Sequence, residues 1–214
     1  MSRYKVSGRI LAAVAVYAKP LVDFYNMRFN RNLDFQKFSR SDLVYEAGKI
    51  HAAEGTEFNA DELIEEVEKF FLSKDFSNLP PFEDAVRVVK RLAVIYNLTI
   101  ITARHSAIHE HTKAWLAKHF PDTFQTINFA HFGKWGYPHK ISKVEKMREN
   151  GVSILIDDAL YNILPAAGAG IKALLYGDYP WNKEIIALPK NVKRAKDWKA
   201  VERILCDKKE PEMH

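Results

Sequence analysis

A lysine followed further along by two adjacent aspartates is the pattern in this chain that most suggests chemistry. Lys143 opens a short helical stretch that Gly151 ends, and an apolar strand starting at Ile154 then runs into Asp157 and Asp158. A helix between two parallel strands runs back along the sheet, so its start and the end of the next strand share one sheet edge. The spacing therefore predicts a place where an ammonium group, two carboxylates, a phosphate and a divalent metal ion meet.

The two aspartates are predicted ligands of a Mg²⁺ ion. Two carboxylates directly after a buried strand repel each other unless a cation lies between them. Mg²⁺ takes carboxylate oxygens readily, so we assign Asp157 and Asp158 to it. The alternative is a loop start in which Asp158 caps the following helix.

A second group of polar residues ends another apolar strand. Thr102, Ala103 and Arg104 follow the buried stretch that begins at Leu98. A hydroxyl followed by backbone N–H groups at the start of a helix can hold a phosphate. We therefore pair Thr102 with Lys143 in phosphate binding, and Ala103 and Arg104 in substrate binding. The alternative is an ordinary strand end, with the Thr102 hydroxyl bonded to nearby backbone and Arg104 in solvent.

The elements that position these residues alternate along the chain. After the tandem prolines at 80 and 81, short apolar strands alternate with helices, which predicts a parallel sheet with helices on both faces, a three-layer Rossmann-like α/β fold. Ligands of such sheets bind beyond the carboxyl ends of the strands, where Thr102 and Asp157 lie. The loop at 177–182 follows the last strong strand, and we expect it either to close over a ligand or to form a packed turn.

Residues 20–76 have a different pattern, with apolar and aromatic residues at helical spacing and no strand-like alternation. We expect this stretch to be an inserted helical cap, and residues 1–19 with 77–214 to form the α/β core. Cap aromatics such as Phe24, Tyr45 or Phe70 are candidates for stacking on a planar ligand, although most such residues belong in the core of the cap.

Composition narrows the classes of function. The 214 residues are 47% hydrophobic and 28% charged with a net charge of +5, typical of a folded protein that binds small anions. No dense basic face suggests nucleic acid, and no apolar run is long enough for a membrane span. The lone Cys206 favours a reducing compartment, so we expect a cytoplasmic protein. A signal peptide over residues 1–18 is the alternative, and the oligomeric state stays open.

Together these residues resemble the haloacid dehalogenase (HAD) superfamily, specifically its 5′(3′)-deoxyribonucleotidase-like branch. The resemblance covers about residues 20–205, including the Thr102 strand end, Ser142 with Lys143, and the Asp157-Asp158 pair. It implies a HAD-like core with a helical cap and a Mg²⁺-dependent phosphatase acting on a small phosphorylated molecule such as a deoxynucleoside monophosphate. It also implies that Thr102 holds the phosphoryl group, Lys143 neutralises it, and Asp157 binds Mg²⁺ with support from Asp158.

The sequence departs from this family at its first motif. The family begins with a strand that ends in Asp-x-Asp, in which the first aspartate attacks phosphorus and the second is the general acid and base. Those positions fall near Arg9 and Leu11, and no Asp or Glu precedes Asp23. The alternatives are therefore a nucleotidase-type hydrolase, a catalytically inactive pseudoenzyme that binds phosphate or nucleotide, or a chain whose first ~18 residues are not the natural start.

Overall fold

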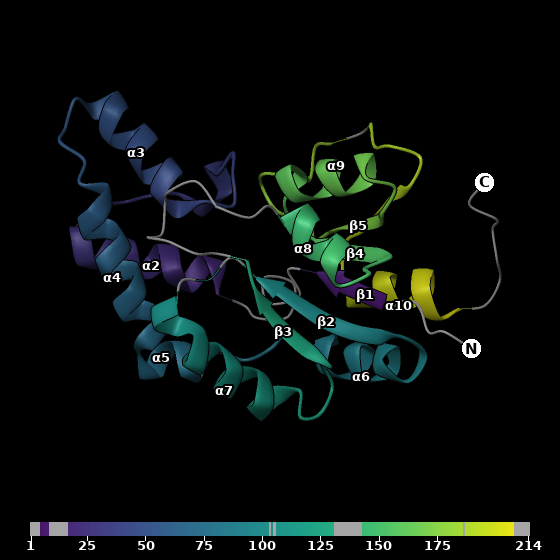
Figure 1. Cartoon of the computed structure of the whole chain (residues 1–214). Helices are drawn as coiled ribbons and strands as arrows, with labels where there is room; N and C mark the ends of the chain where they lie inside the picture. The colour runs from purple at the N-terminus through teal and green to yellow at the C-terminus, as the bar shows by residue number, and fades with distance from the viewer. Residues whose placement is uncertain are drawn as a thin grey trace.

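The computed structural model describes residues 5–8, 17–102, 104, 106–130, 143–185 and 187–207. Within these residues the strands form one parallel sheet in the order β3-β2-β1-β4-β5-β6 (Figure 1). The strands are β1 (Lys5–Gly8), β2 (Asn97–Thr102), β3 (Thr126–Phe129), β4 (Ile154–Asp157), β5 (Lys172–Tyr176) and β6 (Val192–Ala195). The chain order reverses between β1 and β4, and the crevice at such a reversal is where ligands of these folds bind.

The first strand occupies the middle of the sheet. Its Gly8 pairs with Ile100 of β2 on one side and with Ile156 of β4 on the other, so the ends of β2 and β4 flank it. This strand precedes the apolar run at 10–18, and residues 9–16 lie outside the described residues. The sequence also did not predict β6, whose central residues are only partly buried at the edge of the sheet.

The helices follow the expected pattern, consecutive before the tandem prolines and alternating with strands after them. They are α2 (Ala18–Phe29), α3 (Leu43–Glu54), α4 (Ala60–Leu72), α5 (Lys74–Ser77), α6 (Ala85–Ile95), α7 (His109–His119), α8 (Lys143–Glu149), α9 (Leu160–Gly168) and α10 (Trp198–Cys206). Two 3-10 turns, η1 (Phe35–Lys37) and η2 (Ser106–Ile108), precede α3 and α7. Among the described residues, no helix combines the length and apolarity needed to cross a membrane.

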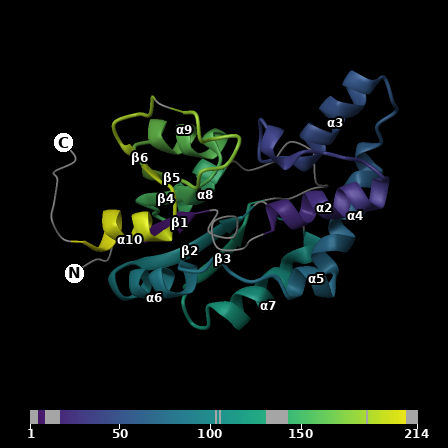
Figure 2. The same ribbon diagram turned by 180° about the vertical axis from the view of Figure 1, so that it is seen from behind.

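Alternation along β4 shows how the layers form. Side chains of a strand point to opposite faces in turn. Ile154 and Ile156 join the core cluster of α6, α7 and α10, whereas Leu155 joins the cluster of α8 and α9. In Figures 1 and 2, α8 and α9 accordingly lie above the sheet, with α6 and α7 below it. The predicted three-layer α/β fold is confirmed.

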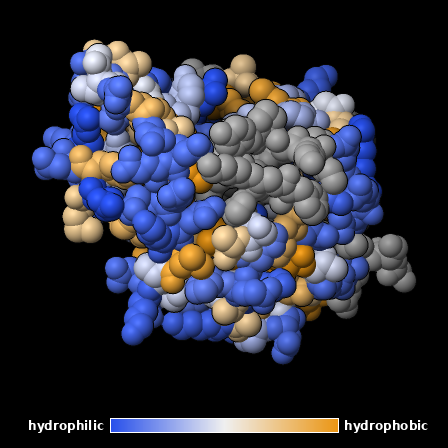
Figure 3. Space-filling model, turned by 60° about the vertical axis from the view of Figure 1, so that its left-hand side comes forward, coloured by the Kyte–Doolittle hydropathy of each residue, from blue (hydrophilic) through white to orange (hydrophobic). Residues whose placement is uncertain are grey.

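Helices α2 to α5 have a hydrophobic core of their own, which we call the cap cluster. Its buried residues include Leu21 of α2, Ala47 of α3, Leu63 of α4 and Phe76 of α5. Asp42, Asn59 and Ser73 begin the last three of these helices, each accepting a hydrogen bond from a backbone N–H of the first turn. Figure 1 shows α3 and α4 standing away from the sheet, and Figure 3 shows a mainly hydrophilic surface with apolar residues in small separate groups. The division into core and cap at residues 20 and 76 stays a prediction.

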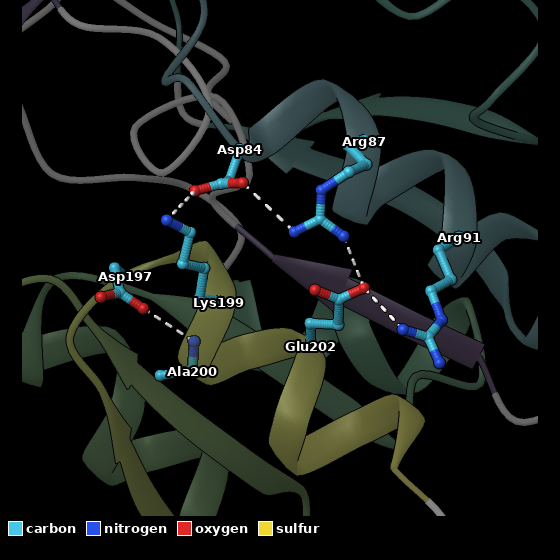
Figure 4. Close-up of polar contacts among 7 residues, drawn as sticks. All are labelled: Asp84, Arg87, Arg91, Asp197, Lys199, Ala200 and Glu202. Carbon is cyan, nitrogen blue, oxygen red and sulfur yellow. Dashed lines mark hydrogen bonds and ion pairs between the residues drawn. The ribbon is translucent and has the colours of Figure 1, made fainter.

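An ion-pair network joins α6 to α10 (Figure 4). The Glu202 carboxylate accepts hydrogen bonds from Arg87 and Arg91, both at 2.7 Å. Asp84 pairs with Arg87 at 3.2 Å and with Lys199 at 3.4 Å. The two arginines lower the pKa of Glu202 to about 2, since their hydrogen bonds favour its ionised form.

Candidate active site

A buried ion pair lies at the carboxyl edge of the sheet. The Nζ atom of Lys143, the first residue of α8, is 3.1 Å from Oδ2 of Asp157, the last residue of β4. The lysine side chain is 10% exposed and the aspartate side chain is 0% exposed. The expected convergence of these two residues is therefore present, because α8 runs back along the sheet and begins where β4 ends.

Asp157 also accepts hydrogen bonds from the residue before α9 and from a side chain of α9. Its Oδ1 atom accepts from the backbone N–H of Ala159 at 2.9 Å and from Asn162 Nδ2 at 3.0 Å, and the same amide lies 3.2 Å from Oδ2. Asp157, rather than Asp158, thus binds the backbone at the start of α9, where Ala159 precedes the helix. The alternative expectation that Asp158 caps this helix is wrong, because the N-cap residue is Ala159 and no side chain caps the first turn of α9.

Asp158 is buried too, at 3% exposure, and it lines a cavity between the sheet edge and the cap cluster. Its backbone carbonyl accepts hydrogen bonds from Trp181 Nε1 at 3.2 Å and from Asn182 Nδ2 at 2.9 Å. The two adjacent aspartates therefore have different surroundings. One is held by a lysine and an amide, and the other lies at the cavity.

Thr102 ends β2 at the same sheet edge and is 2% exposed. Its Oγ1 atom accepts a long hydrogen bond, 3.4 Å, from the backbone N–H of Arg104. Because β2 and β4 both pair with β1, Thr102 and Asp157 lie on the two sides of the central strand. Ala103, assigned to substrate binding, lies outside the described residues, and the role of each of these residues stays a prediction.

The side chain of Arg104 is not in solvent, so that part of the alternative is wrong, whereas the Thr102 hydroxyl does bond to nearby backbone. The residue is 7% exposed, and its guanidinium lies over the rings of Tyr17, Phe71 and Phe76. Its Nη1 atom donates to Thr112 Oγ1 at 2.9 Å. A buried cation needs such partners because it has lost its water, and ring faces supply part of them.

The cavity beside Asp158 has a volume of about 190 Å³. Its described lining is mostly apolar and comes from both sides of the junction. Tyr17, Phe35 and Phe38 belong to the segments around α2 and η1, and Tyr179 and Trp181 belong to the loop after β5. A cavity of this kind suits the flat or apolar part of a ligand whose charged group lies at the sheet edge.

The loop at 177–182 both forms a packed turn and lines the cavity. Asn182, 1% exposed, donates to the carbonyls of Asp158 and Tyr176, each at 2.9 Å, and accepts from the backbone N–H of Tyr179 at 3.1 Å. Tyr179 and Trp181 stack at 4.7 Å between ring centroids, and Phe35 contacts the tryptophan edge-on at 5.7 Å. Burial raises the pKa of Tyr179, so its hydroxyl stays protonated at neutral pH.

The aromatic residues of the cavity differ from those that the sequence suggested. Phe24 and Phe70 contact each other in the cap cluster at 5.3 Å, and Tyr45 lies under Arg40 at 4.2 Å. None of these three described residues lines the cavity. Tyr17 and Phe35 were not predicted because neither lies in a periodic stretch. The one available signal was the place of Tyr17 just before the predicted cap, whereas Phe35 lies inside it.

The described residues do not complete a site for a resident Mg²⁺ ion. Such an ion needs near-octahedral oxygen ligands, and Asp157 already accepts hydrogen bonds on both oxygens, one of them from a lysine. In the described part of the chain, no three or more His, Cys, Asp or Glu side chains gather where they could hold a metal ion. Arg9 and Leu11 stand in the sequence where the resemblance expects carboxylates. The magnesium assignment of Asp157 and Asp158 stays a prediction.

Comparison with known proteins decides the family. A model of the family described as 5′ nucleotidase, deoxy (pyrimidine), cytosolic type C protein matches residues 16–210. The chain belongs to this nucleotidase family. Comparison with curated proteins gave no match. The match begins after positions 9 and 11 and includes the whole of the site described above.

Solved structures of HAD hydrolases share the fold of this nucleotidase-family chain. The HAD-hydrolase YfnB from Bacillus subtilis, solved bound to magnesium, has a TM-score of 0.62 at 13% identity and covers 96% of this chain and 99% of its own. A HAD-like hydrolase from Streptococcus pneumoniae has a TM-score of 0.54 at 13% identity, with 83% and 85% covered. Protein tyrosine kinase A from Mycobacterium tuberculosis has a TM-score of 0.66 at 14% identity, with 96% and 99% covered. The expected nucleotidase-type family is confirmed by the family match, and these structures confirm the HAD-like fold.

Proposed function

We propose that this nucleotidase-family chain binds a small phosphomonoester, such as a deoxynucleoside monophosphate, at the carboxyl edge of the sheet. The phosphate lies beside Lys143 and Thr102, and the organic part lies in the cavity next to Asp158. The buried ion pair between Lys143 and Asp157 carries the proposal, because it holds an ammonium group at a sheet edge where ligands of this fold bind. We place the protein in the cytoplasm as part of the same proposal.

Binding without hydrolysis is the function that the residues support best. In-line attack on phosphorus needs a nucleophile and an acid or base, and the resemblance expects both from aspartates on the first strand. The chain has Arg9 and Leu11 there. Asp157 is no substitute, because its two oxygens are held by Lys143, Asn162 and a backbone N–H. Loss of a nucleophile and its acid-base partner removes many powers of ten in rate.

Hydrolysis of the same ligand is the second candidate, and the family match favours it. The residues of the site would have the same roles in hydrolysis as in binding alone. Lys143 would neutralise the phosphate charge, the Thr102 hydroxyl would donate to a phosphate oxygen, and the buried surroundings would exclude water. The two candidates therefore differ only in whether a phosphorus–oxygen bond is broken.

One experiment separates them. The purified chain is titrated calorimetrically with a panel of deoxynucleoside monophosphates, and phosphate release is followed on the same samples. We expect binding without release, and we expect Lys143→Met to weaken binding by about tenfold or more, as for loss of a charge-assisted contact. Release that Lys143→Met abolishes would establish the hydrolase instead. A wild-type chain that neither binds nor hydrolyses any of these ligands would overturn the proposal.

A further inference from the structure

The guanidinium of Arg104 lies at the point where the core and the cap cluster meet. Its central carbon is 5.0 Å from the ring centroid of Phe71 in α4 and 5.0 Å from that of Phe76 in α5. It is 5.5 Å from the ring of Tyr17, which immediately precedes α2. A guanidinium within about 6 Å of a ring face is attracted by the ring, and burial strengthens the attraction. Arg104 therefore holds three separate segments around one charge.

The same residue is fixed to the α/β core through its other polar groups. Its backbone N–H donates to Thr102 Oγ1 at 3.4 Å, and its carbonyl lies 2.9 Å from Nε2 of His109. Its Nη1 atom donates to Thr112, a fully buried hydroxyl of α7, at 2.9 Å. Arg104 thus reaches from the phosphate-edge threonine of β2 to the rings at the base of the cap cluster.

Only one of the three rings faces the cavity. Tyr17 lines it, together with Asp158 and Trp181, whereas Phe71 and Phe76 are not among its described lining residues and are buried in the cap cluster. Tyr17 also contacts Phe71, with 5.8 Å between ring centroids. A shift of the guanidinium would consequently move a cavity wall through Tyr17.

We propose that Arg104 is a positioning residue that sets the wall of the ligand cavity relative to the phosphate site. It acts through Tyr17 on the cavity side and through Thr102 on the sheet side, without touching the ligand itself. Lysine cannot replace it, because a compact ammonium group cannot cover three rings and also reach Thr112 in a fixed plane. The inference rests on the proposed function, since it assumes a ligand that spans both places.

The test compares two probes that differ in whether they use the cavity. Inorganic phosphate needs only the sheet edge, whereas deoxythymidine 5′-monophosphate also fills the cavity. For Arg104→Lys we expect the Kd of the nucleotide to rise about tenfold and the Kd of phosphate to stay within about twofold. A residue that merely stabilises the fold would weaken both probes together, so the split between them is the decisive reading.

Two further variants keep the test sound. Phe76→Leu removes a ring that contacts the guanidinium but does not line the cavity, and it should raise the nucleotide Kd selectively, by less than Arg104→Lys. If Arg104→Lys does not fold, Phe76→Leu tests the inference in its place. Arg91→Lys changes an arginine of the remote α6–α10 network and should leave both Kd values unchanged. Calorimetric titration gives all of these constants.

Three results decide the inference. A selective loss of nucleotide affinity in both Arg104→Lys and Phe76→Leu supports it. Unchanged nucleotide affinity, or equal losses for the two probes, overturns it while the proposed function stands. If the wild type binds neither probe, the proposed function is wrong, and the positioning role of Arg104 is then tested separately. The test is the rate of amide hydrogen exchange in residues 17–25. Faster exchange in Arg104→Lys than in Arg91→Lys supports the positioning role, and equal exchange overturns it.

Discussion

The Nζ atom of Lys143 and the Oδ2 atom of Asp157 lie 3.1 Å apart, and the aspartate side chain is wholly buried. Each of these charges satisfies the other in a place where neither has enough water. Removal of one partner leaves an uncompensated buried charge, and this cost is larger than the net value of the pair itself. The ion pair therefore serves as a structural element of the fold as well as a candidate phosphate site.

Replacement of Asp157 by asparagine should destabilise the protein strongly. We expect Asp157→Asn to lower the free energy of unfolding by about 3–5 kcal/mol, because Lys143 keeps its charge without a partner. Urea unfolding measures the change. The double variant Lys143→Met with Asp157→Asn should recover part of this loss, since it leaves no unpaired ion. A loss below about 1 kcal/mol in the single variant would mean that the pair is exposed to solvent in solution.

Gly177 and Gly170 form a matched pair for testing the cavity loop. Both have a positive φ, +82° and +81°, so alanine strains the backbone at each by about 1 kcal/mol or more. A Cβ at Gly170 meets nothing within 4 Å, whereas one at Gly177 would come within 2.3 Å of the Tyr179 ring. We expect both alanine variants to lose stability, and only Gly177→Ala to weaken nucleotide binding by displacing Tyr179.

Calorimetric titration of the two glycine variants gives the comparison directly. Thermal unfolding on the same samples measures their shared backbone strain. Equal nucleotide affinities in Gly177→Ala and Gly170→Ala would show that the position of Tyr179 does not matter to the ligand.

The α6–α10 ion network should make the protein sensitive to acid. The pKa of Glu202 is lowered from its ordinary value of 4.5 to about 2 by hydrogen bonds from Arg87 and then Arg91. A carboxyl group with a lowered pKa stabilises the folded state above the unfolded pKa, and this contribution is lost as the pH falls from about 4.5 towards about 2. We expect the Tm of the wild type to fall over this window by a few degrees more than that of Glu202→Gln.

Thermal unfolding at several pH values checks this prediction. Glu65→Gln, at an exposed position of α4, is the control and should follow the wild type. Parallel Tm curves for the wild type and Glu202→Gln over the acid window would contradict the role of the network.

Ligand binding should not depend on magnesium. Because Asp157 is occupied by protein donors and the first strand supplies no carboxylate, we expect the Kd of phosphate in millimolar Mg²⁺ and in EDTA to agree within about twofold. Calorimetric titration under the two conditions measures the difference. A Kd that is about tenfold lower with Mg²⁺ would restore the metal assignment of Asp157 and Asp158.

Sequence patterns predicted much of the core. Short apolar runs between helical stretches predicted the buried strands. The run at 154–156 is an example, because its length and its place between Gly151 and two aspartates fit a buried parallel strand. The convergence of Lys143 and Asp157 followed from topology alone, since a connecting helix returns its start to the strand end. The strand β6 escaped prediction because its Lys193 and Arg194 hide the apolar pattern at the sheet edge.

The tertiary contacts of individual side chains could not be predicted from sequence patterns. Nothing in the spacing predicted that Arg104 is enclosed by Tyr17, Phe71 and Phe76, which are distant from it in sequence. Such a set of partners has no local periodicity, because it depends on how α2, α4 and α5 meet the end of β2.

The sequence by itself determined the alternation of strands and helices from residue 81 to about residue 176, the polar residues at the strand ends and the lack of a carboxylate before Asp23. These follow from local periodicity and residue chemistry. Only the tertiary structure decided that Asp157 binds the backbone at the start of α9, that Asp158 lines the cavity, and that Tyr17 and Trp181 line it as well. Those relationships depend on packing between segments far apart in the chain, which sets the direction of each side chain and which no spacing in the sequence encodes.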